Sequence, residues 1–158
     1  MTLSIILYLL MQVVFISYVS FIWIKFGIQK SISESYYVLP EKINFLFILF
    51  CWLFAFPAMI LGNSWLMLAA GGGIVFVGAA AAMHLMPTRT VHLTGAIGGI
   101  IASQLSIYFD FNLLWLNIIS LIMAAIVGLT FKKYALFCIE LVAFLAISIA
   151  LGIKLQIF

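Results

Sequence analysis

The chain holds two histidines, His84 and His92, on either side of a short loop in the stretch AAAAMHLMPTRTVHLTGAIGG. Imidazole can bind zinc or transfer a proton near neutral pH, so this pair is a candidate for chemistry. Arg89 lies between the two histidines, and Glu34 and Glu140 are carboxylates that could complete a site. Two histidines with one or two carboxylates can bind zinc and leave a position for water, as in a metal-dependent hydrolase.

The spacing of these residues matches no established catalytic signature. The chain has no H-E-x-x-H zinc motif and no G-x-S-x-G nucleophile elbow. The sequence therefore favours a protein that is not an enzyme and needs no cofactor. The alternative is a hydrolase with His84, His92, Glu34 and Glu140 as catalytic residues, and with zinc bound by His84 and His92.

The elements that position these residues must lie in a lipid bilayer. The chain has 158 residues, of which 68% are hydrophobic and 7% are charged. A soluble domain has about 25% charged residues, and a chain of this length has too little interior to bury so much apolar surface. We therefore predict one transmembrane domain over residues 1–158, with the bilayer as its surroundings and no nucleic-acid partner.

Six apolar segments approach the roughly 20 residues that a spanning helix needs. The sequence thus predicts an all-α integral membrane protein with short loops. The predicted helices are 3–24, 43–61, 64–83, 92–109, 113–131 and 134–153.

The positive charges set the predicted orientation, because cytoplasmic loops carry an excess of Lys and Arg. Every cation except Lys154 falls in the first, third or fifth connection between predicted helices: Lys25, Lys30, Lys42, Arg89, Lys132 and Lys133. We expect these loops in the cytoplasm and both termini on the other side of a plasma or bacterial inner membrane. There Lys30, Lys42 and Arg89 would meet anionic lipid headgroups.

The longest connection contains KSISESYYVLPEK, the most polar stretch of the chain. We expect it to lie along the lipid headgroups, with Tyr36 and Tyr37 as interfacial anchors, because amphipathic rings favour the membrane surface.

Glycine is concentrated in the third and fourth predicted helices. Small residues let membrane helices approach closely, so these two helices are expected to form a tight antiparallel hairpin. The same surfaces could drive self-association or binding to another membrane protein. The glycines that would form them are Gly71, Gly72, Gly73, Gly95 and Gly99.

Five polar side chains lie within or at the ends of predicted helices and could line a pore or bind a ligand. They are Glu140, Gln104, Ser103, Asp110 and Gln12. An intramembrane carboxylate such as Glu140 is a functional candidate because burying its charge is costly. The alternative for all five is hydrogen bonding between helices.

These observations leave three hypotheses for function. The first is an oligomeric membrane protein that forms a pore, or that binds or transports a small or lipid-like ligand. The second is the hydrolase described above, and the third is a structural or assembly subunit of a membrane complex.

Overall fold

The structure, a computed structural model, describes residues 2–82 and 88–157. These residues form helices and no strands, which confirms the predicted all-helical class. The elements are α1 (Leu3–Phe26), α2 (Ser35–Val38), α3 (Phe45–Gly62), α4 (Trp65–Ala82), α5 (Thr88–Phe109), α6 (Leu114–Thr130), the 3-10 turn η1 (Lys132–Tyr134) and α7 (Ala135–Lys154).

A long helix occupies each of the six segments named from the sequence. The largest difference is at α5, which begins at Thr88, one turn before His92. Helix α1, helix α3 and the stretch Lys132–Lys154 are long and apolar enough to cross a membrane, and α4 and α6 are shorter apolar helices. The fold is therefore that expected of a helical membrane protein.

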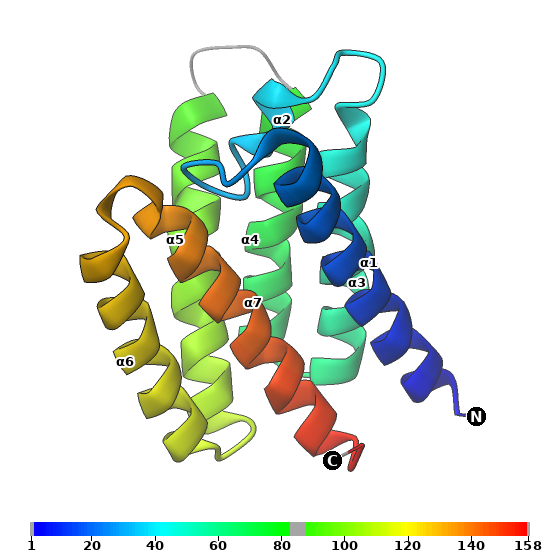
Figure 1. The fold of residues 1–158 in the computed structure, drawn as a ribbon. Helices are drawn as coiled ribbons and strands as arrows, with labels where there is room; N and C mark the ends of the chain where they lie inside the picture. Colours follow the sequence, from blue (N-terminus) through cyan, green and yellow to red (C-terminus); the bar gives the residue numbers. More distant parts are fainter. Residues whose placement is uncertain (1, 83–87, 158) are drawn as a thin grey trace.

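The helices form a bundle with two distinct ends (Figure 1). Both chain termini and the α3–α4 and α5–α6 turns lie at one end, here called the terminal end. The α1–α3 connection and η1 lie at the other, here called the loop end, together with the start of α5. Helix α1 packs on α3 and α7, while α6 packs on α7 and α5.

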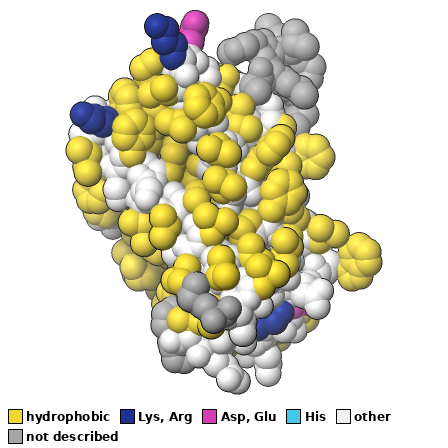
Figure 2. All heavy atoms as spheres, turned by 90° about the vertical axis from the view of Figure 1, so that its right-hand side faces the viewer, with side chains coloured by type: hydrophobic (Ala, Val, Ile, Leu, Met, Phe, Trp, Pro, Cys, Tyr) yellow, Lys and Arg dark blue, Asp and Glu magenta, His cyan; other side chains and the backbone are white. Residues whose placement is uncertain are grey.

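The described surface is apolar over most of its area. Figure 2 shows hydrophobic side chains covering the middle of one face, with Lys, Arg, Asp and Glu near its two ends. Large side chains such as Ile24 and Trp65 are 80% and 85% exposed. Such a surface suits hydrocarbon between two headgroup layers.

Aromatic rings fill the space between α1, α3 and α7. The Phe144 ring of α7 lies 5.4 Å from Phe15 of α1 and 4.7 Å from Phe54 of α3, measured between ring centroids. Stacked and edge-to-face pairs at these distances are favourable, so this cluster holds the three helices together.

Helices α4 and α5 touch through glycine. A Cβ atom on Gly73 would lie 2.5 Å from the carbonyl oxygen of Gly95, and one on Gly99 would lie 3.3 Å from that of Ala70. Any larger residue at Gly73 would push the two helices apart. Gly71 instead faces Met59 of α3. These glycines therefore allow close packing between helices of the same chain. A Cβ on Gly72, in contrast, would meet nothing within 4 Å.

The connection between α1 and α3 differs from the sequence expectation. Ile32, Ser33, Ser35 and Tyr36 are buried in the bundle, and only Tyr37, at 68% exposure, is placed as an anchor would be. Serine hydroxyls provide hydrogen bonds within the connection, which is packed against the helices as well as exposed at Tyr37.

Specific bonds hold this connection, here called the inserted loop (residues 27–39). The Tyr18 hydroxyl lies 2.6 Å from Ser35 Oγ, and Ser35 Oγ donates to the Ile32 carbonyl. The Phe137 amide of α7 donates to the Lys30 carbonyl at 3.0 Å. The inserted loop is thus tied to α1 and to α7.

Candidate functional site

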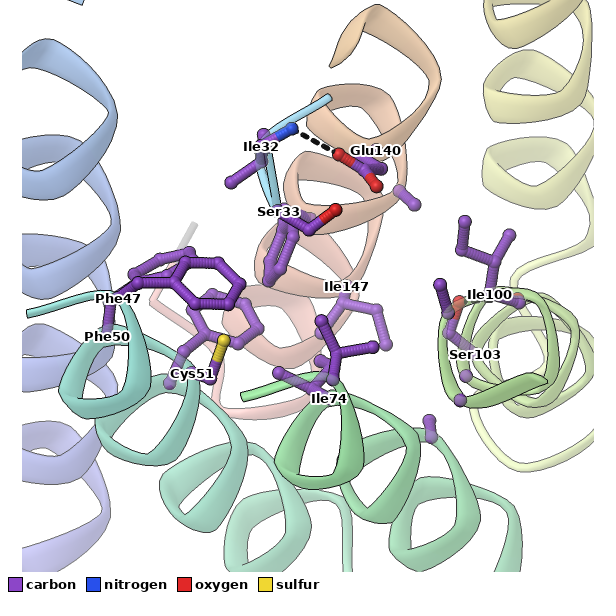
Figure 3. Close-up of a pocket in the computed structure, with 18 residues that line it drawn as sticks. Ile32, Ser33, Phe47, Phe50, Cys51, Ile74, Ile100, Ser103, Glu140 and Ile147 are labelled. Carbon is purple, nitrogen blue, oxygen red and sulfur yellow. Dashed lines mark hydrogen bonds between the residues drawn. The ribbon is translucent and has the colours of Figure 1, made fainter. Parts of the chain in front are cut away.

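A cavity of about 70 Å³ lies between α3, α4, α5, α7 and the inserted loop. Figure 3 shows the side chains that surround it. A buried water needs about 10–15 Å³ on this scale, so the cavity has room for a few waters or a solute of a few heavy atoms. It lies entirely within one chain.

The cavity wall is apolar apart from four side chains. Phe47, Phe50, Phe54 and Phe144 contribute aromatic rings, and small residues of α5 form the opposite side. The polar groups are those of Ser33, Cys51, Ser103 and Glu140. Ser103 Oγ donates to the Ile100 carbonyl of its own helix, so its proton is already used.

Glu140 is the acid of this cavity. It projects from α7, is half-buried, and its Oε2 accepts a hydrogen bond from the Ile32 amide at 2.5 Å (Figure 3). Among the described residues no cationic side chain pairs with Glu140. The carboxylate is therefore bonded to a main-chain amide and not to a described counter-ion.

Of the other residues of the predicted hydrolase site, Glu34 and His92 are described, and neither lines the cavity beside Glu140. Glu34 lies 3.9 Å from Lys30, and its side chain is 39% exposed. His92 is half-buried and bonds to the backbone of Val77, which links α5 to α4. His84 and the side chain of Arg89 lie outside the described residues. Within 2–82 and 88–157 no group of three or more His, Cys, Asp or Glu could hold a metal ion.

Gln104 links α5 to α6. Its side-chain oxygen accepts hydrogen bonds from Asn117 Nδ2 at 3.0 Å and from Ser120 Oγ at 2.8 Å. Gln12 differs, because its side-chain nitrogen is buried without a hydrogen-bond partner among the described residues. Neither amide lines the cavity.

Asp110 lies at the terminal end, far from the cavity. Its Oδ2 accepts hydrogen bonds from Ser64 Oγ at 2.5 Å and Ser106 Oγ at 2.6 Å. Ser64 Oγ in turn accepts from the Met67 amide, which caps the start of α4. Asp110 therefore joins the end of α5 to the start of α4.

Lys30 and Lys42 are exposed at the loop end, where the sequence analysis placed them. At the terminal end, Lys154 Nζ donates to the carbonyls of Leu61 at 3.1 Å and Gly62 at 2.6 Å. A cation at these carbonyls completes the last turn of α3.

Sequence reasoning missed the inserted loop as a part of the site. Ile32 bonds to Glu140, although the two residues are 108 positions apart in the sequence. The three closely spaced serines of SISESYY were the available signal, because their hydroxyls can bond to one another and to main-chain groups of a buried segment.

The chain matches no protein-family model, no curated protein and no solved structure. The cavity and its lining residues therefore carry the functional proposal.

Proposed function

We propose that the chain is a six-span membrane protein that binds a small cation in the cavity and passes it across the bilayer, with Glu140 as the binding group. The observation that carries this proposal is a carboxylate beside an internal cavity with no cationic partner among the described residues. The solute class it favours is ammonium or a small alkylammonium ion.

The chemistry of the wall supports a cation over an anion or a neutral solute. The rings of Phe47, Phe50, Phe54 and Phe144 border the same space as Glu140. An aromatic face attracts a cation, and a nearby carboxylate adds a charge-assisted hydrogen bond to an N–H group. A cavity of about 70 Å³ restricts the solute to a few heavy atoms.

The cost of keeping Glu140 also supports a function. A carboxylate inside a bilayer is costly, by at least about 2.5–3.5 kcal/mol at the centre and less toward the ends, so intramembrane acids are commonly found on ion pathways. The Ile32 amide offsets part of the cost at Glu140. Leucine at the same position would avoid it.

The proposed topology has α1, α3, α4, α5, α6 and α7 as spans and both termini outside the cytoplasm. All cations except Lys154 then lie on the cytoplasmic side, as the positive-inside rule requires. A plasma or bacterial inner membrane follows from the same rule. Self-association stays a separate proposal.

Uptake of labelled methylammonium into liposomes tests this proposal. Glu140→Gln should abolish saturable uptake while preserving the fold, because the glutamine oxygen can still accept the Ile32 hydrogen bond. Asp110→Asn is the matched control, since it is the same acid-to-amide change away from the cavity, and it should retain uptake. Absence of uptake by reconstituted wild-type protein, or equal uptake by Glu140→Gln, would refute the proposal.

A further inference from the structure

We propose that the outward-facing groove between α4 and α5 binds an acyl chain of an anionic phospholipid. The groove has a volume of about 730 Å³, and all its lining residues belong to these two helices. Gly72 and Gly98 form its floor, with Trp65 and Phe76 beside them. Gly72 and Gly98 do not line the Glu140 cavity, so this inference stands independently of the proposed transport function.

The two floor glycines are not needed by the packing of the chain. A Cβ atom added to Gly72 or Gly98 would meet nothing within 4 Å, in contrast to Gly73, where it would meet the Gly95 carbonyl oxygen at 2.5 Å. Glycine destabilises a helix interior relative to alanine. Packing within the chain therefore does not require glycine at these two positions, and the space beside them is open to an occupant from outside the chain.

The shape of the groove favours an acyl chain over the helix of a second copy. Trp65 and Phe76, which are 85% and 61% exposed, stand beside the glycine floor. A helix resting on these rings would leave the hollow below it empty and lose van der Waals contacts. A flexible hydrocarbon chain can follow the hollow, and it brings no unsatisfied polar group into the membrane.

The charge at one end of the groove favours an anionic headgroup. The hydroxyl-bearing residues Thr90 and Thr94 line the groove in the first turns of α5, at the loop end. The N-terminus of a helix attracts anions. This end of the bundle also carries Lys25, Lys30, Lys42, Lys132 and Lys133, whereas Lys154 lies at the terminal end. A phosphate here would meet favourable charge, hydroxyl donors and helix amides together.

Photolabelling in vesicles tests the inference. The wild-type protein would be reconstituted in phosphatidylcholine vesicles with a trace of phosphatidylglycerol that carries a diazirine in its acyl chain. After illumination, we expect labelled peptides to be concentrated on 65–76 and 90–99. Unlabelled phosphatidylglycerol should compete more strongly than additional phosphatidylcholine. Uniform labelling of all helices, or equal competition by both lipids, would overturn the inference.

Two variants fill the groove from opposite sides. Gly98→Leu and Gly72→Leu should each reduce labelling of the α4–α5 peptides to the level found on α6. Ala125→Leu, on the exposed surface of α6, is the matched control and should leave labelling unchanged. Melting temperature identifies a variant that fails to fold, in which case the other variant and the lipid competition decide. A wild-type dimer that Gly98→Leu dissociates would assign the groove to a second copy and overturn the lipid proposal.

Discussion

The two ends of the bundle each place a charged side chain against main-chain groups, but the surroundings differ. At the terminal end, Lys154 donates to two carbonyls that α3 leaves unpaired. At the loop end, Glu140 accepts from the Ile32 amide and also borders a cavity. The difference shows that a buried main-chain bond alone does not identify a functional charge, because the space beside it decides whether a solute can reach it.

Two carboxylates, one at each end of the bundle, allow the same comparison with the chemical group held constant. Asp110 and Glu140 are both carboxylates near the ends of helices, and both bond to neighbouring elements. The partners of Asp110 are two serine hydroxyls. Asp110 does not line the cavity. Asp110 therefore joins α5 to α4, and solute binding is proposed for Glu140 alone.

The largest loss of stability is expected from a substitution in the α4–α5 contact, which lies between the two ends of the bundle. Gly73→Ala places a methyl group against the Gly95 carbonyl and should cost about 1–3 kcal/mol, the usual range for overpacking. Gly72→Ala, one position earlier and facing open space, should be neutral or stabilising. Unfolding in mixed micelles would measure both, and equal effects would contradict the assignment of Gly73 to the interface.

The next largest effect is expected at Glu140, where two substitutions separate its structural role from its proposed binding role. Glu140→Leu removes the acceptor of the Ile32 hydrogen bond, so the inserted loop should open more often. Hydrogen exchange of the Ile32 and Ser33 amides should accelerate by about tenfold, the factor for a loss of about 1.4 kcal/mol. Glu140→Gln should keep slow exchange. If both variants exchange at the wild-type rate, the Glu140 bond does not hold the loop.

A smaller effect is expected from the cation at the terminal end. Lys154→Met keeps the apolar stem but leaves the Leu61 and Gly62 carbonyls without a charged donor. The expected cost is about 0.5–1 kcal/mol, as for a cation at a helix C-terminus, with methylammonium uptake unchanged. Thermal unfolding and liposome uptake would be compared on the same preparation. If Lys154→Met lost uptake but kept wild-type stability, the terminal end would also have a role in transport, and the distinction between the two ends would be wrong.

The smallest effect is expected at Tyr18. Tyr18→Phe removes one hydroxyl from the bond to Ser35, which also bonds to the Ile32 carbonyl and so keeps a partner. Because Ser35 keeps this partner, we expect about 0.5 kcal/mol, the low end of the net value of one hydrogen bond. Thermal unfolding would measure it, and a cost above that of Gly73→Ala would show that the inserted loop contributes more to the fold than the glycine contact.

The helices were predictable from the sequence, whereas the site was largely not. Long apolar runs separated by polar residues locate α1, α3 and α7 without any knowledge of packing. Glu140 was singled out because its charge is unusual in such a run. Its partner Ile32 could not be found, because an apolar residue in a polar loop gives no sign that its amide will reach another helix.

The glycines show a similar limit. Composition indicates that α4 and α5 pack closely, but it does not separate Gly73, which the interface requires, from Gly72 and Gly98, which face outward. That distinction depends on the rotation of each helix about its axis. In the same way, Ser103 and Asp110 are equal candidates in the sequence, but only Ser103 lines the cavity, and Asp110 bonds to Ser64 at the terminal end.

Equilibrium binding of methylammonium to the purified protein tests the central claim most directly. Titration of wild type, Glu140→Gln and Asp110→Asn in one detergent would be followed by the methyl signal in nuclear magnetic resonance. We predict saturable binding to wild type and Asp110→Asn, and loss of that binding in Glu140→Gln. Saturable binding that survives in Glu140→Gln would contradict the role of Glu140, and its absence from the wild type would contradict the proposed site.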